Sequence, residues 1–197
     1  MNRDNADTRL YAYLCRHGQT HWNQHKILQG QLNSPLTELG EQQAESLGQR
    51  AQQWNIGKVA SSSLGRAVQT ATICARQLKV TQSEYPLLAE RHFGDWQGQP
   101  ATGLTEYQQF REIRYEQPDT RPPGRGESTN MVIERLTAGL TALAEQESAR
   151  RILIISHGDA LACLAGTFGQ RKALKNGEGL LLCYAQNRWS WQGWLDE

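Results

Sequence analysis

Two histidines, each followed by a glycine, lie directly after apolar segments near the two ends of the chain. His17 follows the run from Leu10 to Cys15, and His157 follows the run from Arg151 to Ser156. Both runs are typical of buried strands, and the carboxyl ends of parallel strands meet at one edge of a sheet. The pattern predicts that the two imidazoles share one pocket, and Arg16 beside the first indicates an anionic ligand.

Two further charged residues lie where they could join this pocket. Arg66 is placed on the first turn of a helix that follows a strand end, and Glu90 lies in a loop. Guanidinium groups and helix N-termini bind phosphoryl oxygens, a neutral imidazole can attack phosphorus, and a carboxylic acid can protonate the departing oxygen. Because arginines can carry the charge, we expect no metal ion and no cofactor.

Taken alone, each of these residues has an ordinary alternative. A histidine at a strand end is often structural, an arginine on a helix surface is usually solvated, and so is a carboxylate in a loop. The combination favours chemistry, because four short motifs follow strand ends in one chain: Arg16-His17, Ser61 to Arg66, Glu90, and Ser156 to Asp159.

Strands and helices that could position these residues alternate along the chain. Thr37 and Ser128 are predicted helix N-caps. The expected strands cover residues 10–15, 59–62, 84–88, 151–156, 180–185 and 188–194, and the expected helices cover 38–54, 64–78, 104–117, a segment after Ser128, and 160–168. Alternation of this kind predicts an α/β fold, a three-layer α/β/α sandwich with a mostly parallel central sheet and a small cap insertion.

The length of 197 residues fits a single domain. We expect this domain to cover residues 10–197, after a disordered tail over 1–9, with a cap over 98–126 that helps to select the substrate. The cap contains four arginines, Arg111, Arg114, Arg121 and Arg125. They could bind a second anionic group on the substrate, or they could be solvated charges balanced by Glu106, Glu112 and Glu116.

Composition narrows the classes of function. The net charge of +1 gives no general attraction to nucleic acid or to a membrane surface. No apolar run approaches the ~20 residues that span a bilayer, and the polar N-terminus has no apolar stretch of a secretory signal, so we expect a cytoplasmic protein. The 4 cysteines form no metal-binding spacing and are expected to be reduced and buried.

The sequence resembles the histidine phosphatase superfamily, on the branch of the cofactor-dependent phosphoglycerate mutases and their phosphatase relatives. The resemblance covers nearly the whole chain and rests on motifs that occur in the family's order: RHGQTHWN, GQLNSPLTELGEQQA, SSSLGRAVQTA, LLAERHFGDWQG, PPGRGES and ISHGDAL.

The resemblance implies a role for each matching residue. His17 would be the nucleophile that becomes phosphohistidine, and Glu90 would be the general acid and base. Arg16, Arg66 and His157 would complete the catalytic set as ligands of the phosphoryl oxygens. The wider set implied to bind the substrate or its phosphate is Arg16, Asn23, Arg66, His157, Gly158, Gln19, Thr20 and Arg91.

Three activities are consistent with these motifs. We expect a metal-independent phosphatase that acts on a small phosphomonoester, because mutases of the family have a longer chain with a tail over the pocket. Arg91-His92 after Glu90 is typical of the mutases and keeps that alternative open, and a silent binder of phosphorylated ligands is the third. A homodimer also stays open, since the aromatic hairpin with Trp189, Trp191 and Trp194 could be an interface or a buried face.

Overall fold

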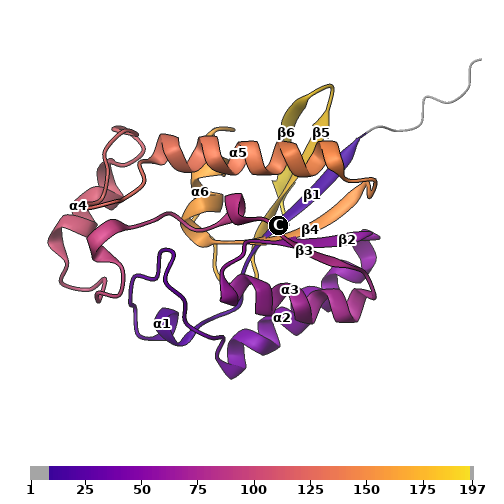
Figure 1. Ribbon diagram of the computed structural model, residues 1–197, viewed down its shortest axis with the longest axis horizontal. Helices are drawn as coiled ribbons and strands as arrows, with labels where there is room; N and C mark the ends of the chain where they lie inside the picture. Colours follow the sequence, from indigo (N-terminus) through magenta and orange to yellow (C-terminus); the bar gives the residue numbers. More distant parts are fainter. Residues whose placement is uncertain (1–8, 196–197) are drawn as a thin grey trace, which may run out of the picture.

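A computed structural model of the chain describes residues 9–195 and contains a six-stranded sheet between two layers of helices (Figure 1). The predicted N-terminal tail lies, except for Arg9, outside the described residues. The strands are β1 (Leu10–Arg16), β2 (Lys58–Ser61), β3 (Gln82–Glu84), β4 (Arg151–Ser156), β5 (Gly179–Ala185) and β6 (Arg188–Trp194).

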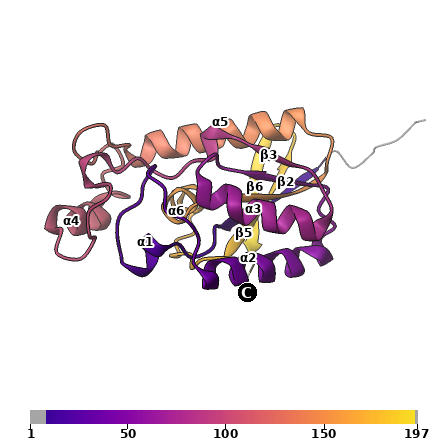
Figure 2. The same cartoon turned by 60° about the horizontal axis from the view of Figure 1, so that its bottom comes forward.

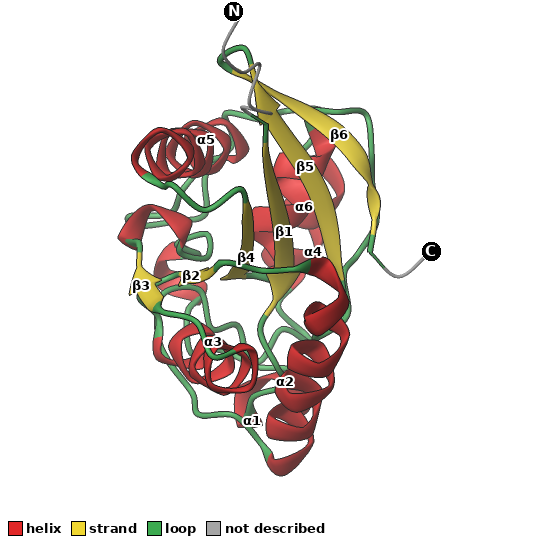
Figure 3. Cartoon of the chain, turned by 90° about the vertical axis from the view of Figure 1, so that its right-hand side faces the viewer, coloured by secondary structure: helices red, strands yellow, loops and turns green. Residues whose placement is uncertain are grey.

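The strands follow the order β3-β2-β4-β1-β5-β6 across the sheet, with β3 and β6 at opposite edges (Figure 3). Strands β3, β2, β4 and β1 are parallel, whereas β5 runs antiparallel to β1 and forms a hairpin with β6. The predicted α/β sandwich with a mostly parallel sheet and a C-terminal hairpin is therefore confirmed.

Helices cover both faces of the sheet (Figure 2). Helices α2 (Glu38–Ala51) and α3 (Gly65–Leu78) pack on one face, and α5 (Thr129–Gln146) and α6 (Gly158–Gly166) pack on the other. Strand β4 supplies both cores, because alternate side chains of a strand point to opposite faces. Ile152 and Ile154 join the α5 and α6 side, and Leu153 and Ile155 join the α2 and α3 side.

The predicted N-caps begin their helices as expected. The Thr37 hydroxyl accepts a hydrogen bond from the backbone N–H of Gly40 at 3.1 Å, and the Ser128 hydroxyl accepts one from Met131 at 3.2 Å. Each bond satisfies a donor at the start of a helix that has no partner within the helix.

Two predicted elements differ clearly from the structure, and one short helix was not predicted. Residues 84–88 are not a strand: β3 ends at Glu84 and Pro86–Leu88 form a 3-10 turn, since proline has no N–H for a ladder bond. Helix α4, in the segment that the sequence predicts to be a cap, is shorter than predicted and covers Thr105–Ile113. A four-residue helix, α1 (His21–Gln24), was not predicted. Thr20 and Asn23 form a reciprocal capping box at its N-terminus.

The cysteines lie in the interior, and the tryptophans of the C-terminal hairpin pack against it. All four cysteines are buried, as predicted. Trp189, Trp191 and Trp194 are half-buried and pack against the core on the α5 and α6 side. Among the described residues, no helix is both long and apolar enough to cross a membrane.

Candidate active site

The strand ends bring the two predicted histidines together. Arg16 is paired with Ser156 in the parallel β1–β4 ladder, and the backbone N–H of His17 donates to the Ser156 carbonyl at 3.1 Å. The ring centroids of His17 and His157 lie 5.1 Å apart, edge to face. Both rings are buried, so the sheet edge brings two imidazoles together below the surface.

The hydrogen bonds of His17 fix its tautomer. Its Nδ1 lies 2.7 Å from the Gly18 carbonyl oxygen, which can only accept, and its Nε2 lies 3.1 Å from Arg66 Nε, which can only donate. The proton is therefore on Nδ1, and the Nε2 lone pair faces the pocket's cations. Burial and the charges of Arg66 and Arg16 lower the pKa of His17 well below its usual range, so the ring is a neutral nucleophile at neutral pH.

Arg66 is held in place by backbone carbonyls of a distant loop. It lies on the first turn of α3, and its guanidinium donates to the carbonyls of Leu32 at 2.8 Å and Gly30 at 2.7 Å. Burial lowers the pKa of Arg66 to about 10, which keeps the group charged at neutral pH. A buried cation with fixed geometry is a preorganised ligand for phosphoryl oxygens.

Several buried nitrogen atoms beside His17 have no hydrogen-bond partner among the described residues. These are Arg16 Nε and both ring nitrogens of His157, although another Arg16 nitrogen donates to the Leu174 carbonyl at 2.7 Å. Buried polar nitrogens without partners are costly. Arg16 Nε–H and one N–H of His157 are donors, so the cluster indicates a place where a ligand's oxygens accept hydrogen bonds. A side chain at Gly158 would begin 3.1 Å from Arg16 Nε and would press on that guanidinium.

Glu90 is anchored at the N-terminus of α6. Its Oε1 accepts hydrogen bonds from the backbone N–H groups of Arg91 and Ala160, both at 2.9 Å. Its Oε2 accepts one from the backbone N–H of Asp159 at 3.2 Å. Burial and the nearby Asp159 carboxylate raise the pKa of Glu90, and they outweigh these hydrogen bonds and the charge of Arg66. A raised pKa suits a carboxylic acid that must donate a proton near neutral pH.

Asp159 connects Glu90 to two arginines. Its carboxylate lies 2.5 Å from Arg91 Nε and 3.2 Å from Arg114 Nε, and Arg114 directly follows the cap helix α4. Burial alone would raise the pKa of Asp159, but the charges of Arg91 and Arg114 lower it, so Asp159 stays ionised beside Glu90. The structure thus places a fixed negative charge next to the candidate acid.

Replacement of Asp159 by asparagine is expected to lower the pKa of Glu90, because the carboxylate that raises it is gone. The alkaline limb of the pH profile of kcat/KM should move to lower pH. The variant should also lose roughly 3 kcal/mol of unfolding free energy, since Arg91 loses its counter-ion. Urea unfolding measures the loss of stability, and a pH-rate profile measures the shift of the alkaline limb. An alkaline limb that does not move would show that the Asp159 carboxylate does not raise the pKa of Glu90.

The two buried histidines should make the stability of the protein depend on pH. Burial lowers the pKa of both rings, so below the ordinary value of 6.5 the unfolded chain binds more protons than the folded one. Stability is therefore lost as the pH falls below this value. Glu90 acts in the opposite sense, because its raised pKa stabilises the fold at low pH and this contribution is lost as the pH rises through that pKa.

Urea unfolding at several pH values, with His157→Gln beside the unchanged protein, isolates one of these contributions. Between neutral pH and one unit below the ordinary histidine pKa, the variant should lose about 1.4 kcal/mol less than the unchanged protein. An identical pH dependence of the two proteins would mean that folding does not lower the pKa of His157.

The other predicted site residues divide into two groups. Asn23 and Gly158 line the pocket with Arg16, His17, Arg66 and Glu90. Gln19, Thr20 and Arg91 lie behind its wall: Gln19 accepts from the Thr37 hydroxyl at 3.0 Å, and Thr20 caps α1. Arg91 is fully buried and donates to Asp159, the Glu127 carbonyl and Thr129.

Sequence reasoning missed the segment before β5. Asn176 donates to the His17 carbonyl at 2.9 Å and to Asn23 Oδ1 at 3.3 Å, and Leu174 accepts from Arg16. No local sequence pattern marks these residues. They reach the site because β5 pairs antiparallel with β1, with Gly179 opposite Cys15. This pairing places the residues before β5 beside the end of β1.

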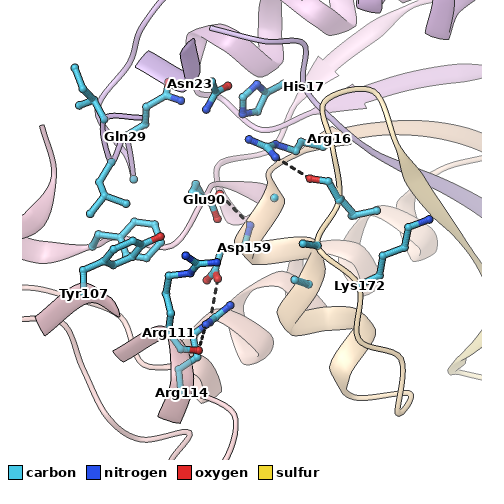
Figure 4. A pocket seen from close by; sticks show the side chains of 18 of the residues that line it. Arg16, His17, Asn23, Gln29, Glu90, Tyr107, Arg111, Arg114, Asp159 and Lys172 are labelled. Atoms are coloured by element: carbon cyan, nitrogen blue, oxygen red, sulfur yellow. Dashed lines mark hydrogen bonds and ion pairs between the residues drawn. The ribbon is translucent and has the colours of Figure 1, made fainter. Parts of the chain in front are cut away.

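Figure 4 shows the resulting pocket, which has a volume of about 450 Å³ and reaches from His17 and Arg16 to the cap. Of the four cap arginines singled out in the sequence, Arg111 and Arg114 line it, whereas Arg121 and Arg125 do not. Tyr107 of α4 lies across the pocket from Arg16, with Glu90 between them (Figure 4). Within residues 9–195, no three histidine, cysteine or acidic side chains form a group that could hold a metal ion.

Comparison with known proteins places this site in a family. The model of the histidine phosphatase superfamily (branch 1) matches residues 12–196. "Probable phosphoglycerate mutase GpmB" of Salmonella choleraesuis (strain SC-B67) is 36% identical over 197 residues, which cover 95% of this chain and 91% of that protein.

Solved structures agree with this match. A structure titled "Mycobacterial hydrolase 1" has a TM-score of 0.82 and 27% identity, covering 94% of this chain and 97% of its own. A mycobacterial glucosyl-3-phosphoglycerate phosphatase in complex with VO3 has a TM-score of 0.79 and 26% identity, covering 94% and 98%. The chain whose strand ends join His17 to His157 therefore belongs to the histidine phosphatase superfamily, branch 1.

Proposed function

We propose that the protein hydrolyses a small phosphomonoester through a phosphohistidine intermediate on His17, without a metal ion. The observation that carries this proposal is the state of His17: neutral, protonated on Nδ1, and with Nε2 directed at Arg66. The pocket also holds Arg16 and Glu90, and burial and the nearby Asp159 carboxylate raise the pKa of Glu90. His17, Arg16, Arg66 and Glu90 line one cavity, and His157 is buried beside His17 without being part of the cavity lining, which supports the roles proposed for them.

In the first step, the Nε2 lone pair of His17 forms a bond to phosphorus as the ester oxygen leaves with the bonding electrons. Arg16, Arg66 and His157 donate hydrogen bonds to the non-bridging oxygens, and the Nε–H of Arg66 turns from His17 to the phosphoryl group. Glu90 gives its proton to the departing alkoxide, so the alcohol leaves neutral.

In the second step, the Glu90 carboxylate takes a proton from a water molecule that attacks phosphorus. The bond between phosphorus and Nε2 breaks, its electrons return to His17, and inorganic phosphate leaves. Glu90 is protonated again, which restores the starting state. Glu90 thus donates a proton in the first step and accepts one in the second.

A phosphoglycerate mutase is the second candidate, because the relative quoted above carries that name at 36% identity. A mutase has to keep water away from its phosphoenzyme. Arg111 and Arg171 at this pocket are exposed, so water reaches its wall. That accessibility favours hydrolysis, and the glucosyl-3-phosphoglycerate phosphatase among the structural relatives adds support.

The test is turnover of p-nitrophenyl phosphate and of a panel of phosphorylated metabolites, with and without EDTA. We expect phosphate release that EDTA does not alter. A parallel assay follows the isomerisation of 3-phosphoglycerate by the protein in the presence of 2,3-bisphosphoglycerate. Interconversion faster than phosphate release would establish the mutase, EDTA-sensitive turnover would contradict the metal-free mechanism, and binding of phosphate esters without either reaction would identify a silent binder.

A further inference from the structure

The segment that carries Glu90 is held in place by side chains from distant parts of the chain. Residues 89–93 belong to no helix or strand, so their backbone groups need partners outside a regular ladder. Side chains supply such partners at four consecutive positions: the carbonyls of Leu87, Leu88, Ala89 and Glu90 accept from Arg135, Ser156 and Gln31. The position of the candidate acid therefore depends on residues outside the pocket.

Arg135 of α5 makes most of these contacts. Its guanidinium donates to the carbonyls of Leu87 at 2.8 Å, Ala89 at 3.0 Å and Glu90 at 3.3 Å. It also donates to both carboxylate oxygens of Glu127, from Nε at 2.8 Å and from Nη2 at 2.9 Å. A planar guanidinium has five N–H donors in a fixed arrangement and can serve all these acceptors at once, whereas an ammonium group has three.

Glu127 holds the segment on the other side of the acid. Its carboxylate accepts from the backbone N–H of His92 at 2.8 Å, and its own N–H donates to the His92 carbonyl at 2.8 Å. Its backbone carbonyl accepts from the Arg91 side chain at 2.8 Å. The Arg135–Glu127 pair thus contacts the backbone both before and after Glu90.

The same contacts connect the acid to a candidate phosphoryl ligand. The Gln31 side chain donates to the Glu90 carbonyl at 3.1 Å. The residues on either side of it, Gly30 and Leu32, are the ones whose carbonyls hold Arg66. The acid and the arginine are therefore both tied to one short loop.

The Arg135–Glu127 pair lies behind the pocket wall. Neither residue lines the cavity, and their side chains are only 17% and 13% exposed. A pair in this place can change a rate only through the groups that it holds. Such an effect can be large, because a shift of about 1 Å in a reacting group can cost about 100-fold in rate.

We propose that the Arg135–Glu127 pair positions Glu90 for proton transfer in both steps of the hydrolysis. Both members are positioning residues, and they act through the backbone of the segment that carries the acid. This proposal rests on the proposed function and adds to it the contacts that set the geometry of its acid.

The first test compares two esters of similar size whose leaving groups differ in their need for an acid. p-Nitrophenolate departs unaided, whereas the alkoxide of benzyl phosphate needs a proton from Glu90. Arg135→Lys keeps the positive charge but has too few donors for all the acceptors. In this variant kcat/KM for benzyl phosphate should fall about 10- to 100-fold, and kcat/KM for p-nitrophenyl phosphate should stay within about threefold of the wild-type value.

The second step gives a separation of kcat from KM. Glu90 also has to activate the water that cleaves the phosphohistidine, so in Arg135→Lys kcat for p-nitrophenyl phosphate should fall about 10- to 100-fold. Its KM should fall in proportion, because kcat/KM is retained. Rapid mixing should then show a burst of p-nitrophenolate of about one per protein molecule, followed by slow turnover.

Two further variants complete the kinetic test. Glu127→Gln should give the same pattern as Arg135→Lys, because Arg135 loses its counter-ion and the segment loses its second attachment. Arg76→Lys is the matched control, since Arg76 is an exposed arginine of α3 that does not line the pocket. This control should keep the wild-type values for both esters.

Hydrogen–deuterium exchange gives a readout that does not need turnover. The backbone N–H groups of Arg91 and His92 donate to the carboxylates of Glu90 and Glu127. In Arg135→Lys and in Glu127→Gln these two amides should exchange at least about 10-fold faster, whereas the amides of strand β4 should exchange at the wild-type rate.

The outcomes separate this proposal from the proposed function. If the unchanged protein hydrolyses neither ester, the proposed function fails, and the exchange rates still decide whether the pair holds the segment. Equal losses of kcat/KM for both esters would overturn the proposal, because they would indicate general damage to the site. Unchanged kinetics in Arg135→Lys and Glu127→Gln, or unchanged exchange at Arg91 and His92, would overturn it as well.

Discussion

Replacement of His17 by asparagine is expected to reduce kcat/KM for p-nitrophenyl phosphate by at least about 10⁴-fold. Asparagine keeps a polar side chain of modest size but has no lone pair on nitrogen that can attack phosphorus. The neighbouring Arg66 keeps its carbonyl partners Leu32 and Gly30, so the anion ligands should stay in place. Steady-state kinetics and the affinity for inorganic phosphate measure the two effects separately.

The control for this experiment is His25→Asn. His25 is exposed and does not line the pocket, so the variant should retain the wild-type rate. A His17 variant that keeps even a tenth of the activity would show that another group attacks phosphorus, and a control that loses activity would point to damage outside the site.

Replacement of Glu90 by glutamine is expected to reduce kcat by about 10²- to 10⁴-fold, with the larger loss for esters of poorly acidic alcohols. Glutamine can still accept from the N–H groups of Arg91 and Ala160 through one oxygen, but it cannot give a proton to the departing alkoxide. A p-nitrophenolate leaves without help, so its ester should be affected least.

The measurement is a series of phosphomonoesters with leaving groups of graded acidity, at several pH values. In the unchanged protein, activity should fall on the alkaline side as Glu90 loses the proton that its raised pKa retains. The variant should lack that alkaline limb. A loss of equal size for all leaving groups would remove Glu90 from the role of general acid.

Much of the site could be predicted because it depends on local patterns. Apolar runs located β1 and β4, and the carboxyl ends of neighbouring parallel strands share one edge, which brought His17 to His157. Arg66 was placed correctly on the first turn of α3. These positions follow from strand ends and helix starts, which a sequence displays directly.

The remaining features depend on contacts between distant segments. Arg91 lies behind the pocket wall because its partner Asp159 comes from α6, and nothing beside Arg91 in the sequence indicates that ion pair. Asn176 and Arg171 reach the site because β5 pairs antiparallel with β1. The order of strands in a sheet is a long-range property that local periodicity does not encode.

Direct detection of the phosphoenzyme tests the central claim. The protein is mixed with an excess of p-nitrophenyl phosphate, quenched in alkali within one turnover, digested and analysed by mass spectrometry for phosphorylated peptides. We predict a phosphate that is stable in alkali and labile in acid, as a phosphorus–nitrogen bond requires, on the peptide that contains His17 and absent in His17→Asn. Turnover with no phosphorylated histidine, or with the phosphate on another residue, would contradict the account.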